Sequence, residues 1–451
     1  MALHVMDEAN HCLGCKVPRC QQGCPIHTNI PEVIRLLKAN KLDEAGRMLF
    51  ENNPLTTVCS LVCNHENQCE GHCVRGIKGA PVHFSVIENY ISSTYASQMT
   101  QGPAPSNGKK AAIIGSGPAG LTIAVILARY GYDVTIFESH DKIGGVLRYG
   151  IPEFRLPKDT VVKKEIENIE KLGVKIEVDS VAGRLYTVDE LLQEEGFDAV
   201  FIGTGAGLPR FQGIPGESLN GVYSANEFLT RCNLMKAYKF PEYATPIQVG
   251  RRVAVVGGGN VAMDAARTAL RLGAEKVSII YRRSAAEIPA RAEEVEHAKE
   301  EGIDFQLLTN PVEVLGDENG WVKGLRCIRM ELGEPDASGR RSPVATGKHE
   351  MMKADLVIMA LGNDANPIIK DSEPTLKTTK WGSIDLSQGS QKTSLDGIYS
   401  GGDAARGGST AIRAAGDGQA AAREILGNMD LDATKIHAMV DSARSYTEQA
   451  A

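Results

Sequence analysis

The sequence predicts an α/β protein in which two units with parallel strands follow a mainly α-helical N-terminal segment. Two stretches, residues 111–138 and 252–283, each have the pattern of a buried strand, a glycine-rich loop, a helix and a second strand. Eight of the ten cysteines lie between residues 12 and 73, ahead of both stretches. We therefore expect a mainly α-helical domain that holds the cysteines, followed by two dinucleotide-binding (Rossmann-like) domains.

The first unit reads AAIIGSGPAGLTIAVILARYGYDVTIFE. Gly115 would make the tight turn, Gly117 would let the backbone approach a pyrophosphate, and Gly120 would let the helix pack closely on the strand. The start of that helix offers free N–H groups to the phosphates. The second strand ends in Glu138, whose carboxylate suits the hydroxyls of an adenosine ribose and would repel a 2′-phosphate. The first ligand is therefore expected to be FAD or NAD.

Two further stretches are expected to approach this ligand. The segment GGVLRYGIPEFRLPK, residues 144–158, is rich in glycine and proline, so it is expected to be a loop rather than a core element, with Gly145 and Arg148 lining the nucleotide's ring. The run FDAVFIGTGA, residues 197–206, is an apolar strand that ends near Gly205, where backbone can pass close to a ligand.

The second unit, RVAVVGGGNVAMDAARTALRLGAEKVSIIYRR, repeats the pattern with a different ending. Its candidate binding residues are Gly257, Gly259 and Asn260 in the loop, and Gly362 after the matching strand in residues 354–367. Its second strand ends in Arg282 and Arg283 rather than in an acid. Two guanidinium groups suit a 2′-phosphate, so NADP(H) is the expected second ligand. The alternative is that both arginines are solvated surface charges.

The segment from residue 396 to residue 425 is expected to return the chain to the first unit. A short strand leads to a loop with Gly402 and Asp403, and Thr410 stands just before a helix of small residues. Backbone N–H groups and one carboxylate would face a polyol and pyrophosphate there. The charged residues 428–451 are expected to form a helix that packs on the body or meets a partner.

The cysteines form two runs, Cys12-x2-Cys15-x4-Cys20-x3-Cys24-Pro25 and Cys59-x3-Cys63-x5-Cys69-x3-Cys73. Crowded cysteines in a cytosolic chain favour metal over disulfides. Zinc is one interpretation, because it binds paired cysteines with four ligands per ion. The Cys-Pro ending of the first run favours a ferredoxin-type arrangement, in which three cysteines bind one 4Fe-4S cluster and the fourth serves another. Helical apolar spacing over 30–37 and 42–50 would hold the two groups apart in this iron-sulfur domain.

The composition agrees with about three domains in 451 residues. We expect an iron-sulfur domain over 1–106 ending in a linker at 100–109, a FAD-binding domain over 107–225 and 358–451, and a NAD(P)H-binding domain over 226–357. No long apolar run or secretory signal is visible, so the expected location is the cytoplasm and no membrane is involved. The net charge of −7 argues against nucleic acid as a partner.

These motifs resemble the flavoproteins with two dinucleotide-binding domains. The cysteine pattern narrows the resemblance to one branch: the small subunit of NADPH-dependent glutamate synthase, the N-terminal half of dihydropyrimidine dehydrogenase, and the FAD subunit of NADH-dependent ferredoxin:NADP oxidoreductase. It covers residues 11–419, and its signals include CxxCxxxxCxxxCP, CxxxxxCxxxC, YGIPEFRLPK, YRRS followed by IPAR, and MELGEPDASGRR.

The resemblance implies an electron conduit. NADPH, or NADH, would reduce FAD, and electrons would pass singly through two 4Fe-4S clusters to an electron-accepting partner subunit. The large subunit of glutamate synthase is the leading candidate for that partner, ahead of a pyrimidine-reducing subunit and an electron-bifurcating ferredoxin:NADP oxidoreductase. No catalytic nucleophile or acid is expected, because hydride transfer between stacked rings needs none.

The resemblance also implies a set of iron ligands. Cys12, Cys15 and Cys20 would bind one cluster with a non-cysteine fourth ligand, for which Glu88 is preferred over Asn89, and Cys24, Cys63, Cys69 and Cys73 would bind the other. Cys59 would stand outside both sets. Relatives often have proline after the position of Cys63, where this chain has Asn64.

Two rival functions follow from the same motifs. A disulfide reductase of this fold would need a cysteine pair near the flavin, and no cysteine occurs between Cys73 and Cys232. A zinc-bearing, non-enzymatic nucleotide sensor is the other alternative.

Overall fold

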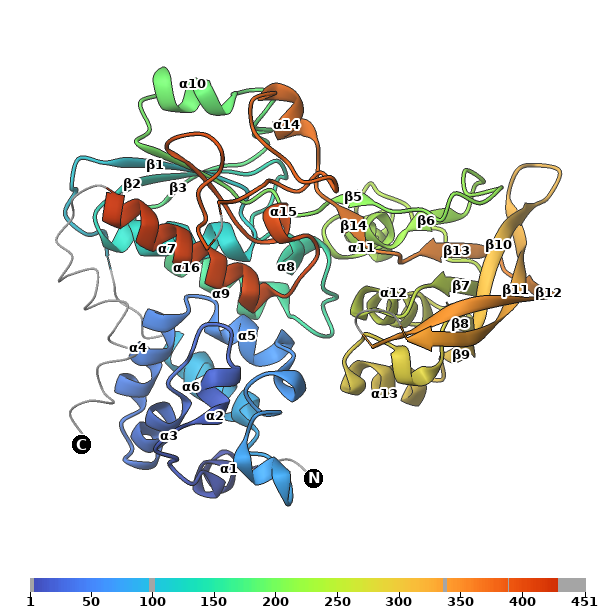
Figure 1. Ribbon diagram of the computed structural model, residues 1–451, viewed down its shortest axis with the longest axis horizontal. Coiled ribbons are helices and arrows are strands. Elements are labelled where there is room, and N and C mark those ends of the chain that lie inside the picture. The colour runs from blue at the N-terminus through green and yellow to red at the C-terminus, as the bar shows by residue number, and fades with distance from the viewer. Residues whose placement is uncertain (1–3, 97–101, 336–338, 388, 429–451) are drawn as a thin grey trace. The chain divides into compact units, whose positions relative to one another are not determined.

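The computed structural model describes residues 4–96, 102–335, 339–387 and 389–428, which form two compact units (Figure 1). The first unit contains the chain up to residue 147, residues 154–206 and the chain from residue 365 onward. The second contains residues 148–153 and 207–364. The helix expected over 428–451 and the start of the expected linker lie outside the described residues. Within the described ranges, no helix has the length and apolarity that crossing a membrane requires.

The N-terminal part of the first unit is helical, as expected. Its helices are α1 (Val5–His11), α2 (Arg19–Gly23), α3 (Ile30–Lys38), α4 (Leu42–Asn52), α5 (Thr56–Val62) and α6 (Phe84–Ala96). In α3, proline occupies the first turn, where its missing N–H costs nothing, and apolar residues recur at helical spacing. Val33, Leu49, Ile87 and Ile91 form a shared core between α3, α4 and α6. The two helices predicted over 30–37 and 42–50 are confirmed.

The first unit also contains a five-stranded parallel sheet. Its strands are β1 (Lys110–Ile114), β2 (Asp133–Phe137), β3 (Lys175–Glu177), β4 (Ala199–Ile202) and β15 (Ile398–Ser400), in the order β15-β4-β1-β2-β3. Helix α7 (Pro118–Arg129) follows β1, and α16 (Ala411–Asn428) packs against α7. Because β15 pairs with β4, the predicted return of the chain to the first nucleotide-binding unit is confirmed.

The segment 144–158 is not the plain loop that the sequence predicts. It contains the short helix α8 (Val146–Tyr149) and leads into a π-helical turn at Lys158–Val162, which continues as α9 (Lys163–Glu170). Leu147 and Leu156 are fully buried. The prediction that this segment is not a core element is therefore wrong, because its two leucines remove apolar surface from water although glycine and proline surround them.

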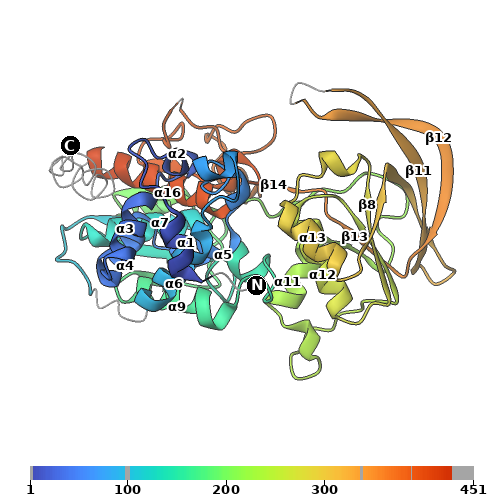
Figure 2. The same ribbon diagram turned by 90° about the horizontal axis from the view of Figure 1, so that it is seen from below.

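The second unit repeats the parallel sheet and adds an antiparallel one. The parallel strands are β6 (Val222–Ser224), β13 (Leu356–Met359), β7 (Arg252–Val256), β8 (Lys276–Tyr281) and β9 (Asp304–Leu307) in that order, with helices α11 (Ala225–Asn233), α12 (Asn260–Arg271) and α13 (Ala292–Glu300). The antiparallel sheet comprises β10 (Thr309–Gly316), β11 (Val322–Pro335) and β12 (Arg341–Lys353), of which β11 and β12 form a long, curved ribbon (Figure 2).

Short elements complete both units. In the second unit, β5 (Leu208–Pro209) pairs with β14 (Asn363–Asp364). In the first, the remaining helices are α10 (Val188–Gln193), α14 (Ile368–Ser372) and α15 (Asp403–Arg406). Helix α10 begins with a capping box, in which Thr187 and Glu190 satisfy each other's backbone N–H groups.

The contact between α16 and α7 gives a first prediction. A Cβ atom on Gly418 would lie 2.5 Å from the carbonyl oxygen of Ala119, so Gly418→Ala should force the helices apart and lower the free energy of unfolding by about 1–3 kcal/mol. Gly427 lies on the same helix with nothing within 4 Å, so Gly427→Ala is the matched control and should cost nothing. Chemical denaturation of both variants would measure this, and equal stabilities would contradict the packing argument.

Candidate cofactor sites and cysteine pockets

The first glycine loop places an open helix start beside tightly packed backbone. Helix α7 begins at Pro118, and the preceding Gly117 makes no side-chain cap, so its first N–H groups face outward. A Cβ on Gly117 would meet nothing within 4 Å, whereas one on Gly120 would lie 2.0 Å from the carbonyl oxygen of Gly115. The loop therefore has room for a ligand at Gly117 and none for side chains at Gly120.

Two other predicted segments meet this loop. A Cβ on Gly145 would lie 2.8 Å from the Cα of Gly117, and one on Gly402 would lie 3.2 Å from the Cβ of Ala119. The strand-end loop that contains Gly205 also reaches the site, because its Gly203 carbonyl would touch a Cβ on Gly115 at 2.5 Å. The fold thus gathers backbone from three distant parts of the sequence around the start of α7.

Glu138 lies at the end of β2 and is held as a carboxylate. Its Oε2 accepts hydrogen bonds from the backbone N–H of Ser116 at 3.0 Å and from the Ser116 hydroxyl, and its Oε1 accepts from the backbone N–H of His140 at 2.9 Å. Burial acts to raise the pKa of Glu138, but these bonds outweigh it and lower that pKa to about 2. The sequence analysis did not identify Ser116 and His140, because hydrogen bonds across loops leave no local pattern.

The segment after β15 supplies a second acidic group and an unsatisfied hydroxyl. Burial raises the pKa of Asp403 to about 6, although the backbone N–H of Ser409 donates to it at 3.0 Å. The buried Oγ1 of Thr410 has no hydrogen-bond partner among the described residues. A buried hydroxyl without a partner is costly, and a polar ligand would satisfy it. These residues therefore fit the phosphate and polyol of FAD.

The second glycine loop has the same form. A Cβ on Gly257 would lie 2.3 Å from the carbonyl oxygen of Ala360, whereas Gly259, just before α12, faces open space, as does Gly362. The Asn260 side chain accepts a hydrogen bond from the backbone N–H of Arg291 at 2.9 Å. Asn260 therefore fixes the IPAR segment against the start of α12, a role that its sequence position did not suggest.

The predicted phosphate-binding arginines stand at the end of β8. Arg282 is exposed, and Arg283 is half-buried, with its Nε donating to the carbonyl of Arg341 at 2.9 Å. Arg340 lies nearby, since its guanidinium donates to the Tyr281 hydroxyl at 3.0 Å. The structure thus adds two arginines from the start of β12 that the sequence analysis missed. Arg148, in the same unit, has a buried Nε without a partner among the described residues.

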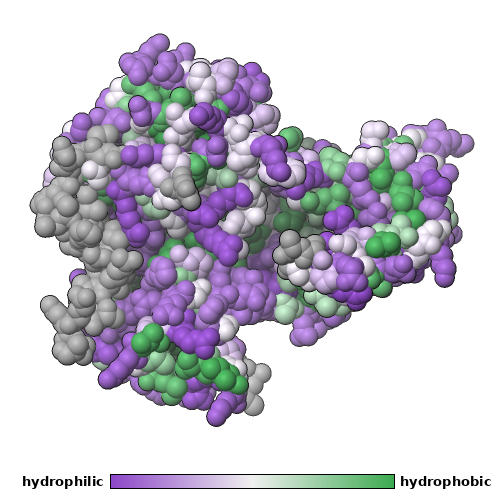
Figure 3. All heavy atoms as spheres, viewed as in Figure 1, coloured by the Kyte–Doolittle hydropathy of each residue, from purple (hydrophilic) through white to green (hydrophobic). Residues whose placement is uncertain are grey.

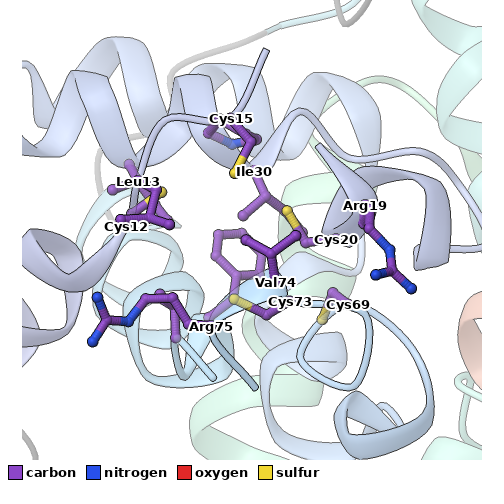
Figure 4. Close-up of a pocket in the computed structure, with 14 residues that line it drawn as sticks. Cys12, Leu13, Cys15, Arg19, Cys20, Ile30, Cys69, Cys73, Val74 and Arg75 are labelled. Atoms are coloured by element: carbon purple, nitrogen blue, oxygen red, sulfur yellow. The ribbon is translucent and has the colours of Figure 1, made fainter. Parts of the chain in front are cut away.

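The cysteine-rich domain contains two pockets. The first cysteine pocket, of about 470 Å³ including the space at its mouth, is lined by Cys12, Cys15, Cys20, Cys69 and Cys73. Figure 4 shows the sulfur atoms of Cys15, Cys20 and Cys73 around one hollow, with the Arg19 and Arg75 side chains directed away from it. The second cysteine pocket, of about 330 Å³, is lined by Cys24, Cys59, Cys63, Cys69 and Glu88.

Two of the predicted ligands lie in different pockets from those that the predicted ligand sets imply. Cys73 lies with Cys12, Cys15 and Cys20, whereas Glu88 lies with Cys24. The pockets therefore place Cys73 and Glu88 differently from the predicted ligand sets, and the ligand assignments stay predictions. The physical reason is the course of the chain: Cys73 opens a 3-10 turn beside the first cysteine run, and α6 directs Glu88 to α5, where its Oε1 accepts a hydrogen bond from the Thr56 hydroxyl at 2.7 Å.

Burial makes both pockets unfavourable for charge unless a cation compensates. It raises the pKa of Cys20 to about 11 and of Glu88 to about 8, and it raises the pKa of Cys24 and of Cys69. Thiolates there need a positively charged partner, which an iron-sulfur core supplies. Among the described residues, no three His, Cys, Asp or Glu side chains converge on one ion position. Ligands spread around a cavity fit the separate irons of a 4Fe-4S cluster better than a single tetrahedral zinc.

Comparisons with known proteins agree with this geometry. Residues 109–418 match the family model described as pyridine nucleotide-disulphide oxidoreductase, and residues 2–100 match the model described as dihydropyrimidine dehydrogenase domain II, 4Fe-4S cluster. The chain is 36% identical over 430 residues to the small chain of NADPH glutamate synthase from Escherichia coli, covering 93% of this chain and 90% of that protein.

Other similarities are more partial. AegA of Escherichia coli is 37% identical over 443 residues and covers 95% of this chain, but the chain spans only 66% of AegA's length. The structure of FprA from Mycobacterium tuberculosis in complex with NADPH has a TM-score of 0.59 at 22% identity, covering 76% of this chain and 91% of FprA. That likeness supports the two predicted Rossmann-like domains, and the family match over residues 2–100 supports the iron-sulfur domain ahead of them.

Proposed function

The chain belongs to the family of the NADPH glutamate synthase small subunit, and on this basis we propose that it carries electrons from NADPH to a partner subunit. When bound, FAD supplies the hydride acceptor and two 4Fe-4S clusters supply one-electron carriers. The protein's own part is to bind and orient these groups. The observation that carries the proposal is the presence of two cysteine pockets in the same compact unit as the first glycine loop.

FAD would be held where the loops meet at the start of α7. Gly115, Gly117 and Gly120 would face the pyrophosphate, with Glu138 at the adenosine end and Asp403 and Thr410 at the polyol. Glu138 is ionised and carries several hydrogen bonds, so it would act as a fixed acceptor that also disfavours a 2′-phosphate. Gly145 and Gly205 would keep side chains out of this site.

NADPH would bind at the second glycine loop. Gly257, Gly259 and Asn260 would form the start of α12 that faces its pyrophosphate, and Gly362 would line the opposite side. Arg282 and Arg283 would bind the 2′-phosphate. The neighbouring Arg340 and Arg341 raise the positive charge at this strand end, which supports NADPH over NADH.

The positions of the two pockets suggest the order of electron transfer. Ile412, in the first turn of α16 and two residues after Thr410, lines the second cysteine pocket. Ile30, Cys69 and Phe84 line both pockets, so the pockets are neighbours. The second pocket would therefore receive electrons from the flavin side, and the first would pass them out of the protein.

The surface around the first cysteine pocket suits a protein partner. Leu13, Val17 and Ile77 are 63%, 69% and 66% exposed, and Figure 3 shows apolar surface over the cysteine-rich domain. The exposed cations Lys16, Arg19, Arg75 and Lys78 form no ion pair with another described residue. Apolar side chains ringed by positive charge, in a chain of net charge −7, favour a partner with an acidic face.

The partner that we propose rests on the similarity to glutamate synthase small chains. We propose the large subunit of glutamate synthase, because the chain is similar to nearly the full length of glutamate synthase small chains, 90% in the Escherichia coli protein and 88% in that of Azospirillum brasilense.

The proposal is tested by anaerobic titration of the purified protein with NADPH, after iron and acid-labile sulfide have been assayed. We expect about eight irons per chain, four for each cluster, with flavin bleaching followed by loss of the broad cluster absorbance. Flavin reduction in a protein with little iron but stoichiometric zinc would contradict the electron relay.

The nucleotide preference gives another prediction. Replacing both Arg282 and Arg283 by alanine should raise the KM for NADPH by about a hundredfold or more, because each charged hydrogen bond contributes about 1.5–3 kcal/mol and both are lost, and should leave the KM for NADH nearly unchanged. Steady-state flavin reduction with both nucleotides would measure this. Arg184→Ala, at an exposed arginine in the other unit, is the control. An equal loss for both nucleotides would refute the assigned role.

The exit surface can be tested by charge reversal. Arg19→Glu with Arg75→Glu should slow electron transfer to the glutamate synthase large subunit about tenfold at low salt and abolish most of its salt dependence, because steering depends on the opposite charges. Reduction of the flavin by NADPH should be unchanged. Lys38→Glu, at an exposed lysine at the far end of α3, is the matched control. Similar slowing by the control would argue against a specific docking face.

A further inference from the structure

The second cysteine pocket offers more ligands than one cluster needs. A 4Fe-4S cluster has four irons and takes one protein ligand at each. Five cysteine and carboxylate side chains line this pocket, Cys24, Cys59, Cys63, Cys69 and Glu88, and His65 and Gln68 line it as well. Cys69 also lines the first pocket, but that pocket already has four other cysteines. One candidate ligand of the second pocket is therefore surplus, and this reasoning rests on the proposed iron-sulfur function.

Cys59 is positioned as a ligand rather than as an ordinary core residue. It lies on α5 one turn before Cys63, so both side chains project from one face of the helix. Both are buried, at 2% and 8% exposed, and they pack with Cys24 and Ile412. The Asn53 amide donates a hydrogen bond to the sulfur of Cys59 at 3.1 Å, as expected for a sulfur that can carry negative charge.

Glu88 reaches the same pocket from the opposite helix. It lies on α6, which packs against α5, and the Thr56 hydroxyl donates to its Oε1 at 2.7 Å. Each of the two competing groups thus has one neutral donor that fixes it at the pocket wall: Thr56 for Glu88 and Asn53 for Cys59. Neither donor is a cysteine or a carboxylate, so Glu88 and Cys59 can each keep its hydrogen bond whether or not it binds iron.

We propose that Cys59 is an alternative fourth ligand of the cluster in the second cysteine pocket. Cys24, Cys63 and Cys69 bind three irons, and Glu88 and Cys59 compete for the fourth. With a cluster bound, either the Glu88 carboxylate or the Cys59 thiolate would hold the fourth iron, and when Cys59 replaces Glu88 its thiol proton would pass to the released carboxylate. No electron is transferred. The two ligand sets differ in an oxygen and a sulfur donor, so they give the cluster two different potentials.

The experiment compares Glu88→Ala, Cys59→Ser and the double variant in the full-length chain. Each is purified anaerobically, assayed for iron and sulfide, and reduced with dithionite for EPR. Glu88→Ala should keep about eight irons with one changed cluster signal, and Cys59→Ser should keep about eight with the original signals. The double variant should lose about four irons, because neither a carboxylate nor a fourth thiolate is then available for the fourth iron.

Two outcomes would overturn the proposal: loss of about four irons in Glu88→Ala alone, or full iron retention in the double variant. Flavin content and the EPR signal of the other cluster report on folding in every variant. Cys232→Ser, at a buried cysteine of the other unit, is the matched control and should leave iron content unchanged. Wild-type protein without iron would instead refute the proposed function itself.

Discussion

The packing of α16 against α7 is the contact on which the arrangement of the first unit depends. Gly418 and Gly402 allow α16 and the loop before it to lie directly on the start of α7. The first turn of α16 then carries Ile412 into the second cysteine pocket, and Gln419 donates to the carbonyl of Asn52 in the helical domain. One helix of small residues therefore joins the proposed flavin site to the cysteines, because only small side chains let backbones approach so closely.

The pKa values of two buried carboxyl groups in this unit are shifted in opposite directions. At Glu138 the hydrogen bond with the His140 ring, together with hydroxyl and backbone donors, outweighs burial and lowers the pKa, so the carboxylate is ionised without any ligand. At Glu88 and at the Cys20 thiol burial dominates and raises the pKa, so the neutral forms are favoured until a cation is present. The first arrangement would suit the hydroxyl groups of a ligand, whereas the second would need a cation to hold its charged forms. The free-energy cost of burying a charge thus distinguishes the two kinds of site.

The two glycine loops share one geometry and differ in charge at the following strand end. The first unit has Glu138 there, and the second has Arg282 and Arg283 with Arg340 beside them. A negative charge disfavours a 2′-phosphate and a cluster of guanidinium groups favours it. Because the two sites share a fold but carry opposite charges, each would bind a different nucleotide. The hydride donor and the hydride acceptor would therefore not bind at each other's site.

The sequence by itself determined the elements whose signals are local. Alternation of apolar runs, glycine loops and helical spacing located both parallel-sheet units and the helices predicted over 30–37 and 42–50, because these patterns follow from backbone geometry. Only the tertiary structure decided which ligands share a pocket. Cys73 lines the first cysteine pocket and Glu88 lines the second, the reverse of the two ligand sets that the family resemblance implied. The turn at Cys73 and the direction of α6 determine which residues they lie beside. Spacing along a chain fixes which residues are close in sequence, but packing of whole helices fixes which side chains meet.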